Sequence, residues 1–436
     1  METDRRDFLI RAGQGTAAAL AAASTARAAA NDRIVVGLVG PGGMGSHHLD
    51  LLAANPRVSL AYVCDVDETR LAAAAAQAEK RSGHAPLAVK DMRRVFDDAS
   101  VDAVWIATPD HWHAPAAILA VQAGKHVYVE KPCCHNIREG RLMVEAARRH
   151  NKIVQAGTQS RSTAHVRQAV ERLRQGVIGQ VLVAKAWNSQ RRRSIGHARP
   201  TDPPSTLDYD LWVGPAPMVP YQANLLPGIW RWWYAFGAGD MGNDGVHDID
   251  IAAWGLGVET HPTSIVASAG KFFFDDDQQF PDTQYVAFDY PGDGQVGHRR
   301  QLVFEQRIWS PYVQEGYENG NAFYGTEGLM LLAKNGGYRV FGPRNKLIEE
   351  VSTGEPDLRA HHQNFLDSIA SGQRPHADVE INHRSSALCH LGNIASRTGG
   401  AIRFDPETEQ IIGNDEAAKL VRRDYRPGHW AVPRGV

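Results

Sequence analysis

The first half of the chain alternates short apolar runs with segments of helical spacing. Residues 33–39, which read Arg-Ile-Val-Val-Gly-Leu-Val, form a nearly continuous apolar run, the pattern of a parallel strand buried on both faces. Comparable runs occupy residues 58–64, 101–109, 126–132 and 152–156. Apolar residues three or four apart predict helices between them, over residues 46–54, 68–81, 115–123 and 137–150. This alternation predicts a doubly wound parallel sheet of the Rossmann type.

The second half of the chain predicts a different kind of sheet. Strands are expected at residues 263–268, 284–290, 301–307, 321–324, 328–333 and 338–341. Helical patterns cover residues 164–176, 361–371 and 384–398. Successive strands of this kind predict a largely antiparallel sheet in an α+β domain. The expected fold is therefore α/β, with a Rossmann domain at residues 31–157 and an α+β domain at residues 158–436.

The composition is that of an ordinary globular protein. With 43% hydrophobic residues, 22% charged residues and a formal net charge of −2, the chain has no basic excess to attract nucleic acid. After the N-terminus, no apolar run is long enough for a membrane span. The part after residue 30 exceeds the usual size of one hydrophobic core, so two domains are expected. Its four cysteines are too few and too irregularly spaced for a disulfide framework or a metal-ligand pattern.

The N-terminus carries an export signature. Arg5-Arg6 stands within Asp-Arg-Arg-Asp-Phe-Leu-Ile, and an alanine-rich run fills residues 12–30. The motif resembles a twin-arginine signal, and the run is too short and too weakly apolar for a permanent membrane helix. Small residues around Ala26-Arg27-Ala28 suit cleavage. Residues 1–30 are therefore expected to be a signal peptide of a periplasmic or otherwise exported protein; the alternative is an alanine-rich tail that happens to hold two arginines.

A glycine-rich turn follows the first strand. Gly40, Gly42 and Gly45 occupy the glycine positions of G-x-G-x-x-G, and Gly43 and Met44 complete the turn before a helix. This is the context of a dinucleotide site. The first glycine permits the tight turn, the second lets the backbone approach the pyrophosphate, and the third lets the helix pack closely on the strand.

A carboxylate ends the second strand. Asp65 lies twenty residues after Gly45, where it can accept hydrogen bonds from the adenosine ribose and repel a 2′-phosphate. NAD is therefore favoured over NADP, and nearby Arg70 keeps NADP open. The alternative is that the glycines form only a structural turn.

Polar residues gather where the later strands end, which is where doubly wound sheets bind their ligands. The cofactor-binding candidates there are Thr108, Pro109, Asp110 and His113 after one strand, and Glu130 and Lys131 after the next. The ammonium of Lys131 could stabilise an alkoxide while hydride leaves a carbinol carbon, and could exchange a proton with it. On the residues alone, a surface lysine paired with Glu130 is equally open.

Three motifs of the N-terminal half match one family. They are the glycine-rich strand and turn, Ala-Thr-Pro-Asp-His-Trp-His-Ala-Pro at residues 107–115, and Glu-Lys-Pro at residues 130–132. Together they resemble the Gfo/Idh/MocA oxidoreductases, and the similarity covers nearly all of the chain after the leader. The resemblance implies that Lys131 is catalytic and that the face of the C-terminal sheet supports a homo-oligomer.

A histidine motif lies in the second half, at residues 239–250. Helical spacing from Asp244 onward places Asn243, Asp244, His247 and Asp250 on a face apart from the apolar residues. A histidine flanked by carboxylates at this spacing is held in one tautomer and can accept a proton near neutral pH. In relatives of the family with dehydrogenase activity, such a histidine is the acid/base, and an aspartate four residues earlier assists it. In this chain that earlier position is Asn243.

Because an asparagine cannot accept a proton, either Asp244 replaces the missing aspartate or His247 works with Lys131 alone. The catalytic candidates are Lys131, His247, Asp244 and Asn243. Two other interpretations are that the acids merely cap a helix, or that His247, Asp248 and Asp250 ligate a metal. No H-x-x-x-H or comparable spacing supports a metal, and none is expected.

Tryptophans concentrate in the middle of the chain, where six of the ten lie between residues 187 and 254. Residues 190–227 are rich in Pro, Asp, Arg and Gly, which indicates a long ordered loop over a site. Aromatic rings beside polar groups suit a sugar; the polar candidates are Arg191, Arg192, Arg193, Asn224 and Arg231. Alternatively, the tryptophans pack the loop on the sheet or fill a subunit interface.

These features predict an enzyme that transfers hydride between a tightly bound NAD and a sugar, cyclitol or related polyol. The second hypothesis is a redox-neutral NAD-dependent glycosidase, which oxidises a ring carbon, eliminates the aglycone, adds water and reduces the ring again. A binding protein without catalysis is the third. Because a periplasm offers no free nicotinamide pool, export implies that the cofactor is retained and recycled in place.

Overall fold

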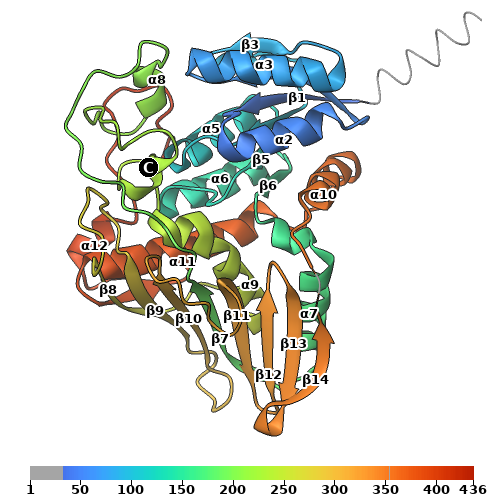
Figure 1. The fold of residues 1–436 in the computed structure, drawn as a ribbon, viewed down its shortest axis with the longest axis vertical. Coiled ribbons are helices and arrows are strands. Elements are labelled where there is room, and N and C mark those ends of the chain that lie inside the picture. The colour runs from blue at the N-terminus through green and yellow to red at the C-terminus, as the bar shows by residue number, and fades with distance from the viewer. Residues whose placement is uncertain (1–32, 353) are drawn as a thin grey trace, which may run out of the picture.

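The computed structural model describes residues 33–352 and 354–436. The expected signal peptide, residues 1–30, lies outside the described residues. The rest of the chain forms one parallel and one mostly antiparallel sheet with helices packed against them (Figure 1), which confirms the expected fold class. Across the described part of the chain, no helix combines the length and apolar character needed to cross a membrane.

The N-terminal sheet is parallel and has the strand order β3-β2-β1-β4-β5-β6. Its strands are β1 (Ile34–Val39), β2 (Val58–Cys64), β3 (Leu87–Val89), β4 (Ala103–Ile106), β5 (His126–Val129) and β6 (Val154–Ala156). The helices that follow them are α2 (Gly43–Ala53), α3 (Glu68–Ser82), α4 (Arg93–Phe96), α5 (Asp110–Gln122) and α6 (Ile137–Arg149). The chain reverses its direction across the sheet between β1 and β4, and ligands of such sheets bind at that point.

Helix α5 begins at Asp110, so its predicted start at Pro115 is wrong. A proline inside a helix cannot donate to the carbonyl four residues earlier, which here belongs to His111. Arg423 donates to that carbonyl instead, Nη2 to oxygen at 2.8 Å. The helix can therefore extend in front of the proline, because a residue from the far end of the chain satisfies the freed oxygen.

The C-terminal sheet has the strand order β14-β13-β12-β11-β7-β10-β9-β8-β15-β16. Its strands are β7 (Val181–Asn188), β8 (Ser264–Gly270), β9 (Thr283–Tyr290), β10 (Arg300–Arg307), β11 (Asn319–Gly325), β12 (Leu329–Ala333), β13 (Gly337–Gly342), β14 (Lys346–Val351), β15 (Ala401–Asp405) and β16 (Gln410–Ile412). Strands β7 and β10 pair in parallel, and the other neighbours are antiparallel. The predicted strands are all present, but β7, β14, β15 and β16 were not among them.

Helices α7 (Ala164–Arg174), α9 (Val246–Leu256) and α11 (Val379–Arg397) pack against one face of this sheet (Figure 1). Buried side chains such as Val286 and Phe323 point into the core between the helices and the sheet. Because side chains alternate along a strand, their neighbours Tyr285 and Tyr324 point to the opposite face, where both are exposed. No helix of the described residues covers that face of the C-terminal sheet.

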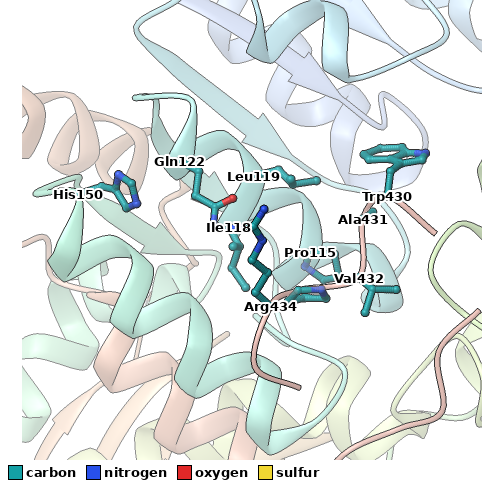
Figure 2. A pocket seen from close by; sticks show the side chains of 10 residues that line it. Pro115, Ile118, Leu119, Gln122, His150, Trp430, Ala431, Val432 and Arg434 are labelled. Atoms are coloured by element: carbon teal, nitrogen blue, oxygen red, sulfur yellow. The ribbon is translucent and has the colours of Figure 1, made fainter. Parts of the chain in front are cut away.

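Two later segments return to the N-terminal half. Helix α10 (Leu358–Ser371) places Phe365 against Trp105 of β4, with ring centroids 5.0 Å apart. The C-terminal tail packs Trp430 into the apolar cluster around α5. A groove of about 360 Å³ lies between this tail, α5 and the end of α6. Figure 2 labels nine of its lining residues: Pro115, Ile118, Leu119, Gln122, His150, Trp430, Ala431, Val432 and Arg434. The core around the parallel sheet therefore includes residues well beyond 157.

Candidate functional site

A large cavity lies where β1, β2, β4 and β5 end. Its volume is about 780 Å³, within the range of ligand and cofactor sites. Twelve predicted site residues line it: Gly40, Gly42, Gly43, Met44, Asp65, Thr108, Pro109, Asp110, His113, Glu130, Lys131 and Asn243. The remaining three, Gly45, Asp244 and His247, are not among the lining residues.

The glycine-rich turn has the shape and the donors that a dinucleotide needs. Gly40 has a φ of 84°, and a side chain there would meet the carbonyl oxygen of Ala107 at 2.7 Å. Helix α2 begins after Gly42, which provides no side-chain cap. The first N–H groups of the helix are therefore open to an anion, and the residues fit a bound pyrophosphate.

Asp65 ends β2 and lines the same cavity. Its Oδ1 accepts the backbone N–H of Asp67 at 2.9 Å, which leaves Oδ2 for ribose hydroxyls. Burial raises the pKa of Asp65 to about 6, while the hydrogen bond from Asp67 and the charge of Arg70 limit the rise. Arg70 in turn lies 3.8 Å from the carboxylate of Asp67. The residues at this end of the cavity fit NAD.

We expect NAD affinity to fall when the pH is lowered from about 7 to about 5. Protonation of Asp65, whose pKa is raised to about 6, removes the anionic acceptor for the ribose. Asp65→Asn should abolish this pH dependence and weaken NAD binding by about 10- to 100-fold, the range for hydrogen bonds to a charged group. Calorimetric titration of nucleotide-free protein measures both effects.

The control for this prediction is Asp67→Asn. Asp67 caps helix α3 by accepting from Thr69 and Arg70, and asparagine serves equally well as a cap. This variant should still lose NAD affinity as the pH falls, with the midpoint moved to a slightly lower pH, because the charge of Asp67 makes a minor contribution to the raised pKa of Asp65. A pH-independent affinity of the native protein would show that Asp65 does not hold the ribose.

The loop expected over the site lies across the adenosine end of the cavity. The N–H of Glu68 donates to Thr206 oxygen at 3.0 Å, and the N–H of Asp208 donates to Val66 oxygen at 3.0 Å. The loop includes the short helix α8 (Tyr209–Val213), which lies near the β3 edge of the parallel sheet in Figure 1. Its side chains lining the cavity include Leu207, Leu211 and Tyr221. The loop therefore covers the segment where Asp65 would bind the ribose.

Lys131 follows β5 and lines the cavity from the opposite end. Its Nζ donates to the backbone oxygen of Asn243 at 2.6 Å. Glu130 does not take this ammonium, because its carboxylate accepts His48 Nε2 at 2.9 Å and the backbone N–H of Lys131 at 3.1 Å. Burial opposes ionisation of Glu130, but His48 and Lys131 lower its pKa to about 2. These contacts contradict the alternative interpretation, in which Lys131 is a surface lysine paired with Glu130.

The histidine motif starts with a π-helical turn, Met241–Gly245, and continues into α9. Asp244 lies in this turn and makes no hydrogen bond to His247, although the sequence predicts that it assists that histidine. The side chains that hold its carboxylate are Lys334 at 2.8 Å, Asn319 at 3.0 Å and Arg192 at 3.3 Å. Burial would raise the pKa of Asp244, but Lys334 and the other positive neighbours bring it well below its usual range.

His247 is buried, and its Nδ1 has no hydrogen-bond partner among the described residues. Burial and the charges of Lys334 and Lys131 lower the pKa of His247 to about 3. The expectation that it titrates near neutral pH is therefore wrong: burial and the two lysines outweigh the attraction of Asp244. Of the two alternatives for the missing aspartate, replacement by Asp244 is disfavoured, because Lys334, Asn319 and Arg192 hold its carboxylate.

His113 and Asp110 lie in the first turn of α5. The ring nitrogens of His113 are 2.6 Å from Pro132 oxygen and 2.8 Å from Thr108 oxygen. The ring therefore braces the turns after β4 and β5, and burial lowers its pKa. Asp110 has one buried oxygen without a partner, and burial raises its pKa to about 7 against the charges of Lys131 and Arg231.

The two carboxylates considered as metal ligands with His247 have other partners. Asp248 accepts from Lys334 at 3.1 Å, and Asp250 pairs with Arg161 at 2.8 Å. Within the described residues, the potential ligands that do converge lie elsewhere: His261, His383 and Glu409.

This second cluster is a hydrogen-bonded network. The Nε2 atoms of His261 and His383 lie 2.9 and 2.7 Å from one oxygen of Glu409, and Arg141 donates to the same oxygen at 2.7 Å. The Nδ1 atoms of both histidines lack the acceptor that usually orients a metal-bound imidazole. The neighbouring guanidinium also disfavours a cation, so the cluster does not fit a metal.

The polar residues expected around a sugar separate into three groups. Arg231 lines the cavity beside Trp230. Arg192 pairs with Asp240 at 2.9 Å, and Asn224 donates to Asp277 at 2.8 Å. Arg191 and Arg193 are exposed. The site residues that the sequence did not indicate are Lys334 and the lining side chains Lys90, Met92, Leu207, Leu211 and Tyr221.

Comparison with known proteins agrees with this geometry. The family model described as "Oxidoreductase family, NAD-binding Rossmann fold" matches residues 34–158. Its companion, "Oxidoreductase family, C-terminal alpha/beta domain", matches residues 184–292 and 334–432. The chain belongs to the Gfo/Idh/MocA oxidoreductase family. Its N-terminal sheet is therefore an NAD-binding domain, as the glycine-rich turn predicts.

The curated relatives of this Gfo/Idh/MocA chain are similar to it over only part of their own length. Inositol 2-dehydrogenase 2 of Saccharopolyspora erythraea is 32% identical, covering 51% of this chain and 54% of that protein. Levoglucosan dehydrogenase of Pseudarthrobacter phenanthrenivorans is 34% identical over 34% of this chain and 38% of its own. A glycosyl hydrolase family 109 protein of Shewanella putrefaciens is 29% identical over 42% and 45%. The matches thus span about half the length of these relatives or less.

Solved structures share the fold over most of the chain. A levoglucosan dehydrogenase in complex with NADH and L-sorbose has a TM-score of 0.65 and 19% identity, covering 85% of this chain and 99% of that one. The WlbA dehydrogenase of Bordetella pertussis, in complex with NADH and UDP-GlcNAcA, has a TM-score of 0.63 and 20% identity, covering 86% and 99%. At these identities the likeness establishes the fold.

Proposed function

We propose that this Gfo/Idh/MocA protein transfers hydride between NAD and a CH–OH group of a sugar, cyclitol or related polyol. The observation that carries the proposal is the position of Lys131. Its ammonium lines the NAD cavity without a carboxylate partner in the described residues and is held by the backbone of the histidine motif. Relatives named inositol 2-dehydrogenase and levoglucosan dehydrogenase support this class of substrate.

The residues of the site divide the chemistry among them. When bound, NAD⁺ supplies the hydride acceptor: the carbinol carbon loses hydride with two electrons, NADH forms, and loss of the hydroxyl proton leaves a carbonyl. Lys131 donates a hydrogen bond to the substrate oxygen and stabilises its growing negative charge. The hydroxyl proton passes to water in the cavity, because His247, whose pKa is lowered to about 3 and which is not among the lining residues, is too weak a base to take it near neutral pH. Asn243 positions Lys131 through its backbone oxygen.

We also propose that NAD is retained and that the protein is exported with it. The loop bonded to Val66 and Glu68 lies across the adenosine end of the cavity, so release of NAD requires the loop to open. The Arg5-Arg6 motif supports the twin-arginine pathway, which carries folded, cofactor-loaded proteins. With no nicotinamide pool outside the cytoplasm, a second substrate must restore the cofactor in place.

The uncovered face of the C-terminal sheet supports a homo-oligomer. Val266, Tyr285 and Tyr324 are exposed there by 49%, 41% and 43%. Exposed apolar and aromatic side chains gathered on one sheet face are typical of a protein interface. We propose that subunits of this protein associate through that face.

A redox-neutral glycosidase is the second candidate. It is favoured by relatives named glycosyl hydrolase family 109 proteins. Oxidation of a ring carbon would permit loss of the aglycone, addition of water and return of the hydride, with no net change in the cofactor. A retained NAD suits this cycle as well as it suits an exchange between two polyols.

The test uses protein purified from the periplasm without added nucleotide. Mass spectrometry under non-denaturing conditions should find a chain without its leader, bound NAD and an oligomer. Polyols from a broad panel should then change the near-ultraviolet absorbance of the reduced nicotinamide. Cleavage of a chromogenic glycoside without added NAD and without net absorbance change would assign the glycosidase instead. No response to either, with NAD confirmed as bound, would contradict both and leave a binding protein.

A further inference from the structure

Arg231 lines the substrate end of the cavity without a hydrogen-bonded partner among the described residues, and its guanidinium lies over the ring of Trp230, 5.6 Å from the centroid. It lies in a short 3₁₀ helix, Ile229–Trp232, beside Trp230. In the part of the chain that the structure describes, its guanidinium forms no hydrogen bond or ion pair, and its Nε is enclosed without an acceptor. A guanidinium nitrogen that is shielded from water without an acceptor costs solvation energy that a partner normally offsets. The missing partner is therefore a group that enters the cavity.

The carboxylates around Arg231 do not replace that partner. Asp240 is already saturated by Asn188 at 2.9 Å, Asn243 at 2.9 Å and Arg192 at 2.9 Å. Asp110 has an unpartnered oxygen and makes no ion pair with the guanidinium. The positive charges of Arg231 and Lys131 therefore face the substrate space together, with no anion bound to either among the described side chains.

We propose that the substrate carries a carboxylate, as in a uronate or another sugar acid, and that Arg231 binds it. This inference rests on the proposed function and specifies its substrate class. The planar guanidinium fork matches a carboxylate with two parallel hydrogen bonds. Trp230 offers a ring face for the C–H side of a pyranose. Lys131 is left for the reacting hydroxyl, so the two cations serve two different substrate oxygens.

A carboxylate fits this end of the cavity better than a phosphate does. A phosphate monoester carries nearly two negative charges and several strong acceptors, and it favours a group of donors such as open backbone N–H groups. Such donors lie at the glycine-rich turn, where NAD binds. At the opposite end Arg231 offers one planar fork, which suits a single negative charge.

The test measures binding without turnover. Tryptophan fluorescence of the NADH-loaded protein is titrated with matched sugars: glucose, glucuronate and glucose 6-phosphate, and the corresponding galactose and mannose sets. In at least one set the uronate should bind at least about tenfold more tightly than its neutral hexose, as expected for a charge-assisted hydrogen bond. Arg231→Gln should reduce that ratio to about one while NAD content and hexose affinity remain unchanged. Arg231→Lys should retain part of the preference.

The control is Arg193→Gln, which removes an exposed arginine of the same loop and should preserve the uronate preference. The inference is overturned if no uronate is preferred, if a sugar phosphate binds best, or if Arg231→Gln keeps the ratio. It is also overturned if Arg231→Gln releases NAD, since Arg231 would then bind the cofactor. Because no turnover is needed, a uronate preference without hydride transfer would refute the proposed function and leave the binding site standing.

Discussion

Replacing Lys131 with methionine is expected to slow hydride transfer by about 10²- to 10⁴-fold, the usual contribution of a positioned acid or base. Methionine keeps much of the apolar stem and removes the ammonium. The one side-chain hydrogen bond lost is that to Asn243 oxygen, so the fold should persist. NAD should remain bound, because its ribose and pyrophosphate are held elsewhere. Single-turnover absorbance of the NAD-loaded variant at saturating substrate measures the effect on the chemical step.

Lys90→Met provides the matched control. Lys90 lines the same cavity at the adenosine end, where it pairs with Glu68. Losing this charge should leave the single-turnover rate constant at the native value, since the lysine is remote from the reacting carbon. If Lys131→Met transferred hydride within about tenfold of the native rate while NAD stayed bound, the lysine would have no part in the chemical step.

The parallel sheet is predictable from sequence because its central strands are buried on both faces. Continuous apolar runs mark β1 and β4, whose last four residues are all buried. Strand β3 leaves no such signal, because it has three residues and exposes 61% of Leu87. Strand β7 lies in the middle of the other sheet, but Lys185 interrupts its apolar pattern. The ammonium of Lys185 forms an ion pair with the carboxylate of Glu305 of β10, with nitrogen and oxygen 3.3 Å apart. That partner is visible only after folding.

The site also has one part that could be predicted from the sequence and another that depends on contacts formed only in the folded chain. Thr108, Asp110 and Lys131 could be placed together because parallel strands carry their following residues to one edge of the sheet. The state of His247 could not be predicted, because it depends on Lys334 at the end of β12. That lysine lies 90 positions from Asp244 and belongs to no motif. Its ammonium forms an ion pair with Asp244, and its positive charge lowers the pKa of His247.

The largest structural effect is expected from Gly45→Ala. A Cβ at this position would lie 2.0 Å from the carbonyl oxygen of Gly40 and 2.9 Å from its carbon. These are backbone atoms of the same turn, so the contact can be relieved only by opening the junction of β1 and α2. We expect the free energy of unfolding to fall by about 1–3 kcal/mol, as for an overpacked core. The variant should also be purified without NAD, because the open donors of α2 are displaced.

Gly42→Ala separates binding from folding and is the matched comparison. Its φ of −76° suits any residue, and a Cβ there would approach only the end of the flexible Arg70 side chain, at 2.7 Å. Stability should therefore stay within about 0.5 kcal/mol of the native value. The added methyl group nevertheless occupies the space where the backbone approaches the pyrophosphate, so NAD should be lost from this variant too. Denaturant unfolding of nucleotide-free protein and mass spectrometry of bound nucleotide measure the two effects separately. If Gly42→Ala retained NAD in full, the pyrophosphate would not bind at this turn. If Gly45→Ala were as stable as the native protein, the turn would open to admit the methyl group without a cost in stability.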